Sequence, residues 1–476
     1  MPEPPRFSFH PLERRGLLLG LQAGQLVSMA AGAGAALWAR GAVGGATGML
    51  LSFLLLAGGA AGALWTRQGR PLAAWAVLGL AWLQRGRRAS LNEAPLAGTA
   101  LVGGVPAAAR TGGASGGRPR LRPRRAGPPT LPAGVELLQH GAGPAVEGFG
   151  AVRDRPGCRW VAVLPVRGVS FSLLDPDDQA QRLDAWRTVL AAVARPGSPV
   201  TRLQWVQRSG PAGGLGGLYP GPAAPAAPTS AEGRARASYL RLVQEVAPVA
   251  PRHDTWLALA VGGDRRSRAG TGIDTLGREL RFLQGQLRQA GLEPGPALGR
   301  DELGALLGTG SMAGRESWSG LQVDGALFAT YWVSEWPRVD VGPDFLVPLL
   351  MGHGRRMVSL LMAPVPPDRA LREVRSARTA DLADAQLRSR AGFLSSARRD
   401  REAEGVARRE SELADGHAEY RFSAYVAVSG PDEDGLAAAC SELEQAAQAT
   451  RLELRRLYGR QAEAYTWTLP LGRGLR

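Results

Sequence analysis

Two apolar stretches decide the fold of this chain: GLLLGLQAGQLVSMAAGAGAALW at residues 16–38 and AVGGATGMLLSFLLLAGGAAGALW at residues 42–65. An α-helix of about 20 residues crosses the hydrocarbon core of a bilayer, and both stretches reach that length. Arg40 is the only charged residue within them and their short connection. A cleavable signal peptide has a shorter apolar segment. We therefore expect an uncleaved helical hairpin in a membrane, with its turn at residues 39–41.

The distribution of arginines predicts how this hairpin is oriented. Three arginines precede the first stretch, and five follow the second: Arg67, Arg70, Arg85, Arg87 and Arg88. Flanks rich in arginine stay in the cytoplasm. We expect a multi-pass protein of the cytoplasmic (inner) membrane with both termini in the cytoplasm. Trp38 and Trp65, at the ends of the stretches, fit the preference of tryptophan for the headgroup level.

Small residues recur at four-residue spacing in both stretches, as Gly20/Gly24, Gly44/Gly48 and Gly58/Gly62. This spacing lets helix backbones approach closely. It fits either packing within the hairpin or contact with a membrane helix of another subunit. Both interpretations stay open, and we expect an oligomeric assembly with other membrane subunits.

A third apolar segment, residues 71–83, is too short to cross a bilayer and contains Trp75 and Trp82. We expect an interfacial helix whose apolar side chains enter the inner leaflet. The nearby Arg85, Arg87 and Arg88 would then bind anionic lipid headgroups. The alternative is a hydrophobic helix that packs on the soluble domain.

The net charge of +15 belongs mainly to the membrane-proximal part of the chain. Residues 1–134 contain 15 arginines and three acidic residues, whereas residues 135–476 contain 42 arginines and 39 acidic residues. Basicity near a membrane is explained by retention at the inner face and by anionic lipid. The high isoelectric point is therefore poor evidence for nucleic-acid binding.

The composition also excludes several kinds of enzyme. The sequence contains no lysine, so a P-loop, a lysine Schiff base and a serine–lysine pair are impossible. Cys158 and Cys440 lack metal-binding spacing, and the five histidines form no cluster typical of a metal site. The glycine-rich residues 308–314 follow an expected helix, whereas a phosphate-binding loop follows a strand. We predict no catalytic residue, cofactor or metal, and therefore a non-enzymatic protein.

A Pro/Gly/Arg-rich segment, residues 94–134, separates the membrane anchor (residues 1–93) from the soluble part. Its composition cannot form a core, so we expect a linker. Its basic end contains Arg118, Arg120, Arg122, Arg124 and Arg125. These arginines suggest contact with anionic lipid, an acidic partner or a nucleic acid such as DNA, with a solvated linker as the alternative.

Residues 135–476 show the mixed pattern of an α+β domain with mainly antiparallel sheets. Strands at residues 147–155 and 158–167, a helix at 175–194 and a strand at 200–207 form a ββαβ unit, and the second half repeats a similar order. Asp175 and Asp432 stand where helix caps are expected. A second linker is expected at residues 209–229. The remaining expected elements are helices at 231–247, 272–290, 368–415 and 432–450, a strand at 253–261, a strand pair at 325–335 and 356–363, and strands at 418–428 and 451–456.

The C-terminal stretch LRRLYGRQAEAYTWTLPLG, residues 454–472, contains a Gln-x-x-Ala-aromatic-x-x-x-Leu-Pro-Leu-Gly pattern. It resembles the end of the non-ATPase N-terminal domain of the traffic ATPases of type IV secretion and conjugation. Together with the two spans, the chain is similar to an actinobacterial family of two-span integral membrane proteins in which a PrgI-like anchor is fused to such a domain. The resemblance implies a structural or assembly subunit that works beside a separately encoded traffic ATPase. The residues expected to dock that partner are Tyr458, Gln461, Tyr465, Leu469, Pro470 and Leu471.

Three alternatives to this function stay open on the sequence. The chain is also compatible with a core membrane subunit of a type VII-like secretion system. A membrane-tethered nucleic-acid-binding protein in DNA transfer is a second possibility. The third concerns the C-terminal stretch alone, which can be a strand or turn that packs the end of its own domain.

Overall fold

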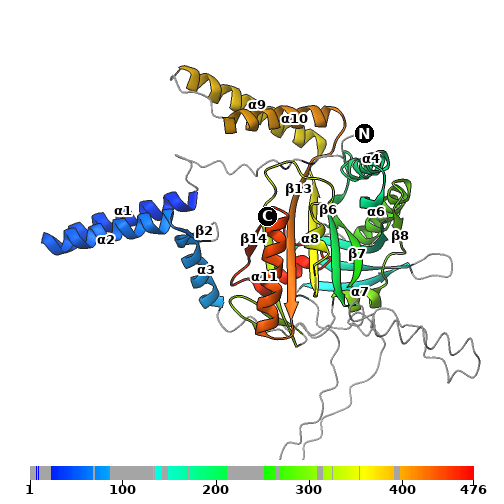
Figure 1. Cartoon of the computed structure of the whole chain (residues 1–476), viewed down its shortest axis with the longest axis horizontal. Helices are drawn as coiled ribbons and strands as arrows, with labels where there is room; N and C mark the ends of the chain where they lie inside the picture. The colour runs from blue at the N-terminus through cyan, green and yellow to red at the C-terminus, as the bar shows by residue number, and fades with distance from the viewer. Residues whose placement is uncertain are drawn as a thin grey trace, which may run out of the picture.

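The computed structural model consists of a helical hairpin and a soluble α+β domain (Figure 1). It describes residues 7, 9, 23–67, 70–85, 132, 134–141, 148–168, 171–211, 251–263, 269–307, 315–323, 325–352, 354–390 and 397–475. The expected linker at residues 94–134 lies outside these residues except for Pro132 and Gly134. The expected helix at residues 231–247 and the glycine-rich residues 308–314 also lie outside them.

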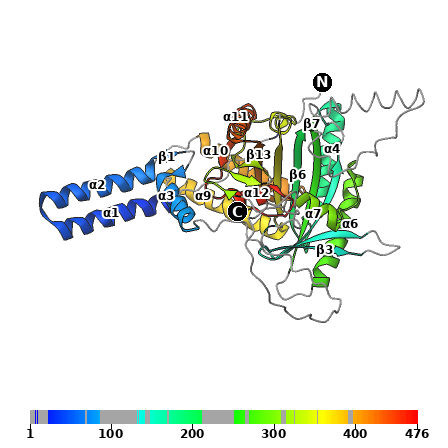
Figure 2. The same cartoon turned by 90° about the horizontal axis from the view of Figure 1, so that it is seen from below.

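The hairpin is formed by α1 (Ala23–Val43) and α2 (Gly45–Leu64), which lie side by side and project away from the soluble domain (Figures 1 and 2). Both helices are long and apolar enough to cross a membrane. The turn lies at Gly44 and Gly45, which have φ values of 61° and 63°. The prediction of a turn at residues 39–41 is therefore corrected, and Arg40 lies inside α1. Consecutive glycines accept a left-handed backbone without the steric cost of a Cβ atom.

The two helices of the hairpin approach each other closely at Gly32 and Gly59. A Cβ atom added to either glycine would lie 2.8 Å from the Cα atom of the other. The Gln25 amide donates a hydrogen bond to the Ala63 carbonyl (2.9 Å), which satisfies a polar group within the apolar pair. Gly58, by contrast, faces open space, so the close contact uses a different glycine pair from those expected at four-residue spacing.

The soluble domain is built around a large, mainly antiparallel sheet. Among the described residues its main path runs β3-β4-β5-β7-β6-β12-β13-β11-β10-β9, with β8 paired to β5 and β14 paired to β11. The strands are β3 (Val135–His140), β4 (Phe149–Asp154), β5 (Arg159–Arg167), β6 (Val200–Pro211), β7 (Pro251–Gly262), β8 (Glu293–Pro294), β9 (Arg315–Glu316), β10 (Leu321–Val323), β11 (Ala326–Glu335), β12 (Arg356–Pro364), β13 (Tyr420–Gly430) and β14 (Glu453–Arg456). The α+β class expected from the sequence is confirmed.

The strand order is a palindrome, because two structural repeats meet at the β6–β12 pair. We call residues 135–307 repeat 1 and residues 315–468 repeat 2. In repeat 1, β5-α4-β6-β7-α6-β8 is a split βαβ unit whose strands lie in the order β8-β5-β7-β6. Repeat 2 has the equivalent order β14-β11-β13-β12. The two repeats pair antiparallel, with Val206 opposite Ser359 at the midpoint of the contact.

The helices also correspond between the repeats. Repeat 1 contains α4 (Pro176–Val193), α6 (Ala269–Gln289) and α7 (Arg300–Leu307). Repeat 2 contains α8 (Val347–Leu350), α9 (Pro367–Arg390), α10 (Ala397–Ala414), α11 (Glu433–Ala449) and α12 (Gln461–Thr468). Helices α6 and α11 end in the same way: Leu292 N–H donates to the Leu287 carbonyl, and Leu452 N–H donates to the Ala447 carbonyl. This is a Schellman-type C-terminus.

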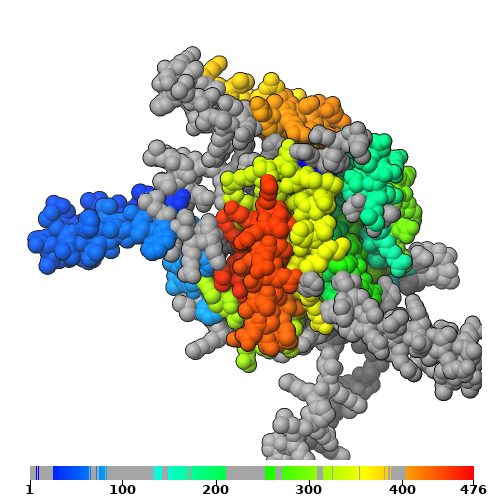
Figure 3. Space-filling view, in the orientation of Figure 1, coloured from blue at the N-terminus to red at the C-terminus, as the bar shows by residue number. Residues whose placement is uncertain are grey.

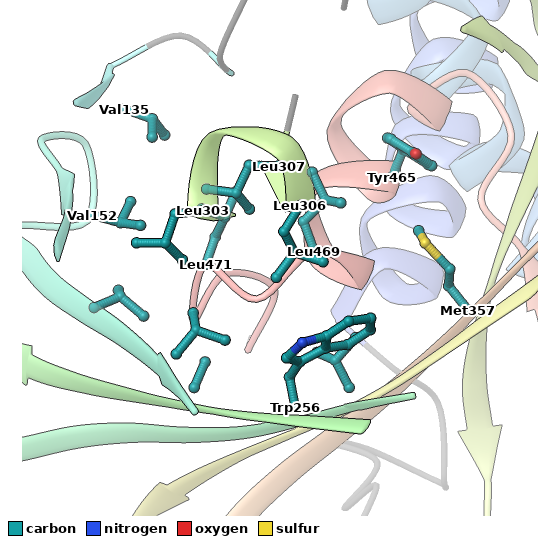
Figure 4. Close-up of a cluster of buried hydrophobic side chains, with 14 of the residues drawn as sticks. Val135, Val152, Trp256, Leu303, Leu306, Leu307, Met357, Tyr465, Leu469 and Leu471 are labelled. Carbon is teal, nitrogen blue, oxygen red and sulfur yellow. The ribbon is translucent and has the colours of Figure 1, made fainter. Parts of the chain in front are cut away.

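Each face of the sheet has its own hydrophobic core. On one face, α4 and α6 cover repeat 1 while α11 and α8 cover repeat 2. On the other face, α7 and the segment that contains α12 pack together over the centre of the sheet, where Leu303 and Leu306 lie near Tyr465, Leu469 and Leu471 (Figure 4). Apolar side chains alternate between these two cores along the central strands, as expected for a sheet that is covered on both faces.

Three predicted elements differ from the structure. The strands at residues 325–335 and 356–363 exist, but β13 lies between them, so they are not a pair. The single helix expected at residues 368–415 is the pair α9 and α10, which contact each other. Residues 209–211, expected in a linker, belong to β6, which pairs with β7 and β12.

Candidate partner and membrane surfaces

The C-terminal segment predicted to bind a partner is part of the domain core. The side chains of Gln461, Tyr465, Leu469, Pro470 and Leu471 are buried. Tyr465, Leu469 and Leu471 pack on the sheet beside α7 (Figure 4). These five side chains are not accessible, so the prediction that they form a docking surface is corrected. The physical reason is that this segment covers the apolar centre of its own sheet.

Two buried glutamines fix this segment by hydrogen bonds to backbone groups. Gln461 accepts a hydrogen bond from Thr330 N–H (2.8 Å) and donates to the Leu457 carbonyl (3.0 Å). Gln204 donates to the carbonyls of Trp467 (3.1 Å) and Leu469 (2.9 Å), and its Oε1 accepts from Gly472 N–H (2.8 Å). A buried backbone group without a partner costs about 1–3 kcal/mol. The two glutamines therefore stabilise the C-terminal segment in its position on the sheet.

An ion-pair group attaches the end of the described chain to repeat 1. The buried Asp154 carboxylate binds Arg473 at 2.6 Å and Arg159 at 3.2 Å. Asp154 is the last residue of β4, whereas Arg473 follows α12. These ion pairs thus attach the segment that follows repeat 2 to the edge of repeat 1.

Tyr458, the sixth predicted docking residue, belongs to an aromatic cluster formed with the helix α3 (Leu72–Arg85). We define this cluster as Trp75, Trp82, Trp318 and Tyr458. Ring centroids are 5.3 Å apart for Trp75 and Tyr458, 5.6 Å for Trp82 and Trp318, and 6.1 Å for Trp318 and Tyr458. Aromatic pairs at these separations are attractive beyond their burial.

The aromatic cluster shows what the two tryptophans of α3 contact. The expected helix at residues 71–83 is present, preceded by the short strands β1 (Thr66–Arg67) and β2 (Arg70–Pro71). Its two tryptophans pack on the soluble domain instead of lipid, which corresponds to the alternative interpretation. Trp318 carried no sequence signal for this role, because its partners in α3 lie more than 200 positions away in the chain.

The segment before α1 contacts the same half of the domain. Phe7 forms a two-way backbone bridge with Val341. The Phe9 ring stacks on Trp336 at a centroid distance of 5.0 Å and lies 5.5 Å from Phe345. Both flanks of the helical hairpin therefore contact repeat 2, one through Phe7 and Phe9 and the other through α3.

The arginines expected to contact lipid or nucleic acid lie largely outside the described residues. These are Arg87, Arg88, Arg118, Arg120, Arg122, Arg124 and Arg125. Arg85 is the last residue of α3, and its side chain is not among those described. The expectation for all eight arginines stays a prediction.

A charged helical hairpin, α9 and α10, projects from the strand connection between β12 and β13 (Figure 1). Ala370 and Val374 anchor its base by burial. Farther out, an ion pair between Arg378 and Glu410 joins the two helices, and Leu382 is exposed. In the space-filling view the hairpin lies at the upper edge of the molecule, in yellow and orange (Figure 3). It presents many charged side chains to solvent.

The described residues contain no group of three or more His, Cys, Asp or Glu that could hold a metal ion. The shifted pKa values have structural causes: burial raises the pKa of the Tyr331 hydroxyl and of the Tyr420 hydroxyl. Tyr420 donates a hydrogen bond to the Leu190 carbonyl (2.6 Å). Asp432 caps α11 by accepting from Gly435 N–H (2.7 Å), whereas Asp175 makes no side-chain cap bond at α4, contrary to expectation.

Comparison with known proteins adds no family assignment. Neither the scan against protein-family models nor the search of curated proteins gave a match to this chain.

Proposed function

We propose that this protein is a non-enzymatic, membrane-anchored assembly subunit of a type IV secretion or conjugation-like apparatus. It holds its α+β domain at the cytoplasmic face of the inner membrane and docks a separately encoded traffic ATPase there. The apparatus and the ATPase are proposed from the resemblance of residues 454–472. The membrane attachment is proposed from the hairpin.

The observation that carries the proposal is the exposed apolar hairpin, whose two flanks contact one soluble domain. Large side chains along α1 and α2, such as Leu37, Phe53 and Leu54, are exposed, which is unfavourable in water and favourable in lipid. Because Phe9 and α3 both contact repeat 2, both ends of the hairpin lie on the same side of any membrane that it crosses. This supports the topology expected from the arginines, with both termini in the cytoplasm.

The surface proposed for the ATPase is the hairpin of α9 and α10. Its base is packed on the domain, while Leu382 and Gln386 farther out are exposed, and both helices carry both signs of charge. Charged surfaces of this kind give specificity and rapid association with a complementary partner. The buried C-terminal segment cannot provide such a surface without unfolding.

Co-purification from membranes tests the proposal. Deletion of residues 385–403, with a short Gly/Ser connection, removes the distal hairpin and keeps the Arg378–Glu410 ion pair. We expect the variant to remain folded in membranes but to lose the ATPase that co-purifies with the full chain. A control outside the hairpin replaces the exposed Leu173 with serine and should retain the ATPase.

Two results would contradict the proposal. Retention of the same ATPase by the deletion variant would exclude the α9–α10 surface. Recovery of a multi-domain ATPase of a type VII-like system with the full chain would replace the apparatus that we propose. Deletion of residues 454–476 is unsuitable here, because it removes α12 and exposes the core that α12 covers.

A further inference from the structure

Helix α3 has two apolar sides, only one of which is covered. Trp75 and Trp82 lie seven residues apart, on one side of the helix, and pack in the aromatic cluster. Val77 and Leu80, on the other side, are exposed. The sequence from Leu72 to Gln84 has no charged residue. A helix that is apolar on all sides is normally buried, so the exposed side is expected to have an occupant.

The position of α3 limits what this occupant can be. The helix begins eight residues after the end of α2 and contacts both α1 and α2. Trp65, directly after α2, is exposed, as is typical of a tryptophan at the headgroup level of a bilayer. The uncovered side of α3 therefore lies at the height where the hairpin would leave the membrane, which is the lipid headgroup layer.

The two repeats of the domain lie at different distances from the helical hairpin. In both Figures 1 and 2, α11 and β13 of repeat 2 lie nearer to the hairpin, and α4 and α6 of repeat 1 lie on the far side. The two attachments of the hairpin, through Phe9 and through the aromatic cluster, are both on repeat 2. Two separate attachments restrict rotation of the domain about either one.

We infer that the side of α3 formed by Val77 and Leu80 lies in the lipid headgroup layer. The aromatic cluster then holds the domain with repeat 2 next to the bilayer and repeat 1 pointing into the cytoplasm. The partner of this surface is the lipid bilayer itself, in the manner of an interfacial helix. This inference rests on the membrane attachment in the proposed function and adds the orientation of the domain.

Three leucines with equal exposure provide the test: Leu54 in α2, Leu80 in α3 and Leu382 in α9 are 57%, 58% and 60% exposed. Each is replaced by cysteine in the full chain, in a Cys158→Gly, Cys440→Ala background, and labelled with an environment-sensitive fluorophore. The protein is placed in nanodiscs of phosphatidylcholine and phosphatidylglycerol, with spin-labelled lipids as quenchers. We expect the label at residue 80 to be quenched about twofold more than that at residue 382 by a shallow spin label. The label at residue 54 should be quenched by a deep one.

The three labels distinguish failure of the inference from failure of the proposed function. Quenching at residue 54 with equal, weak quenching at residues 80 and 382 would overturn the inference and leave the membrane attachment intact. Absence of quenching at residue 54 would overturn both. Energy transfer to acceptor lipids tests the orientation: a donor at Arg315→Cys of repeat 2 should transfer at least about twofold more efficiently than one at Glu293→Cys of repeat 1. Equal transfer would overturn it.

Discussion

Repeat 1 and repeat 2 have the same order of elements, but different groups pack at the equivalent position, between the first and second strands of the split βαβ unit. In repeat 1 the connection from β5 to β6 contains α4, a helix of 18 residues, whereas the corresponding connection in repeat 2 contains α8, with four residues. Aromatic residues, Trp336 and Phe345, together with Phe9 from the start of the chain, pack in this part of repeat 2. Because α8 is short, there is space here for Phe9, which precedes the helical hairpin.

The ends of the repeats differ in a similar way. Phe149, at the start of β4 in repeat 1, is buried against α6. Trp318, three residues before β10 in repeat 2, packs instead with α3. The comparison teaches that a common scaffold keeps its core while one copy acquires contacts with the helical hairpin and its flanks. Four sets of variants break or sharpen this comparison.

The largest effect is expected from leucines that fill equivalent cores. Leu283 in α6 and Leu443 in α11 are both fully buried. Replacement of either by alanine should lower the free energy of unfolding by about 3 kcal/mol, because each leaves a cavity. Since the repeats share one sheet, calorimetry should show one transition that both variants shift equally. Two transitions, each shifted by only one variant, would mean that the repeats unfold independently.

Gln461 has no glutamine counterpart in repeat 1, where Arg300 begins α7. Gln461→Ala should destabilise the protein by about 2 kcal/mol, because Thr330 N–H and the Leu457 carbonyl lose a buried partner. Denaturant titration measures the change. Gln289→Ala, at the exposed end of α6, is the control and should have little effect. An equal effect of the two substitutions would contradict the role that we assign to Gln461.

The contact between the anchor and repeat 2 is expected to be weaker than either core. Trp82→Ala should cost about 1–2 kcal/mol, since it removes the edge-to-face contact with Trp318. Limited proteolysis of the protein in nanodiscs should then cleave near residues 66–71 faster, with the soluble domain left intact. Trp82→Phe retains an aromatic ring and should behave nearly like the unmodified protein. Unchanged cleavage in Trp82→Ala would argue against the cluster as an attachment.

The smallest effect concerns the matching helix ends. Gly291 and Arg451 occupy equivalent left-handed positions, with φ values of 71° and 56°. Arg451→Gly should stabilise the domain by about 0.5–1 kcal/mol, because a residue with a Cβ atom is strained there. Gly291→Ala should destabilise it by a similar amount, which thermal denaturation can resolve. Changes of the same sign in both variants would contradict the equivalence of the two helix ends.

Most single elements were predictable because their signals are local. The amphipathic and alternating patterns placed α4, α6, α11 and the strands β5 and β7 within a few residues. The pairing of the strands was not predictable. In the sheet, for example, β13 lies between β11 and β12, although it comes about 60 residues after β12 in the chain. The turn at Gly44 and Gly45 was placed too early, because the charge of Arg40 suggested the boundary.

The C-terminal site shows why burial of polar residues escapes sequence reasoning. Gln461 and Tyr465 were expected to dock a partner because the resemblance of residues 454–472 implied it. Gln461 is buried because backbone groups of β11 and of the turn before α12 satisfy its amide. Those groups are brought together only by the complete sheet. The local sequence around Gln461 therefore cannot predict these hydrogen-bond partners.

The palindromic sheet has a consequence for the history of the chain. Pairing of β6 with β12 about a midpoint at Val206 and Ser359 is the geometry of a two-fold homodimer. A gene encoding one repeat would make the same sheet from two separate copies. Duplication and fusion would then free each copy from the requirement that identical subunits carry identical surfaces. On this view the present protein is a dimer fused into one polypeptide, in which one subunit acquired the contacts with the helical hairpin and the other was left free to change.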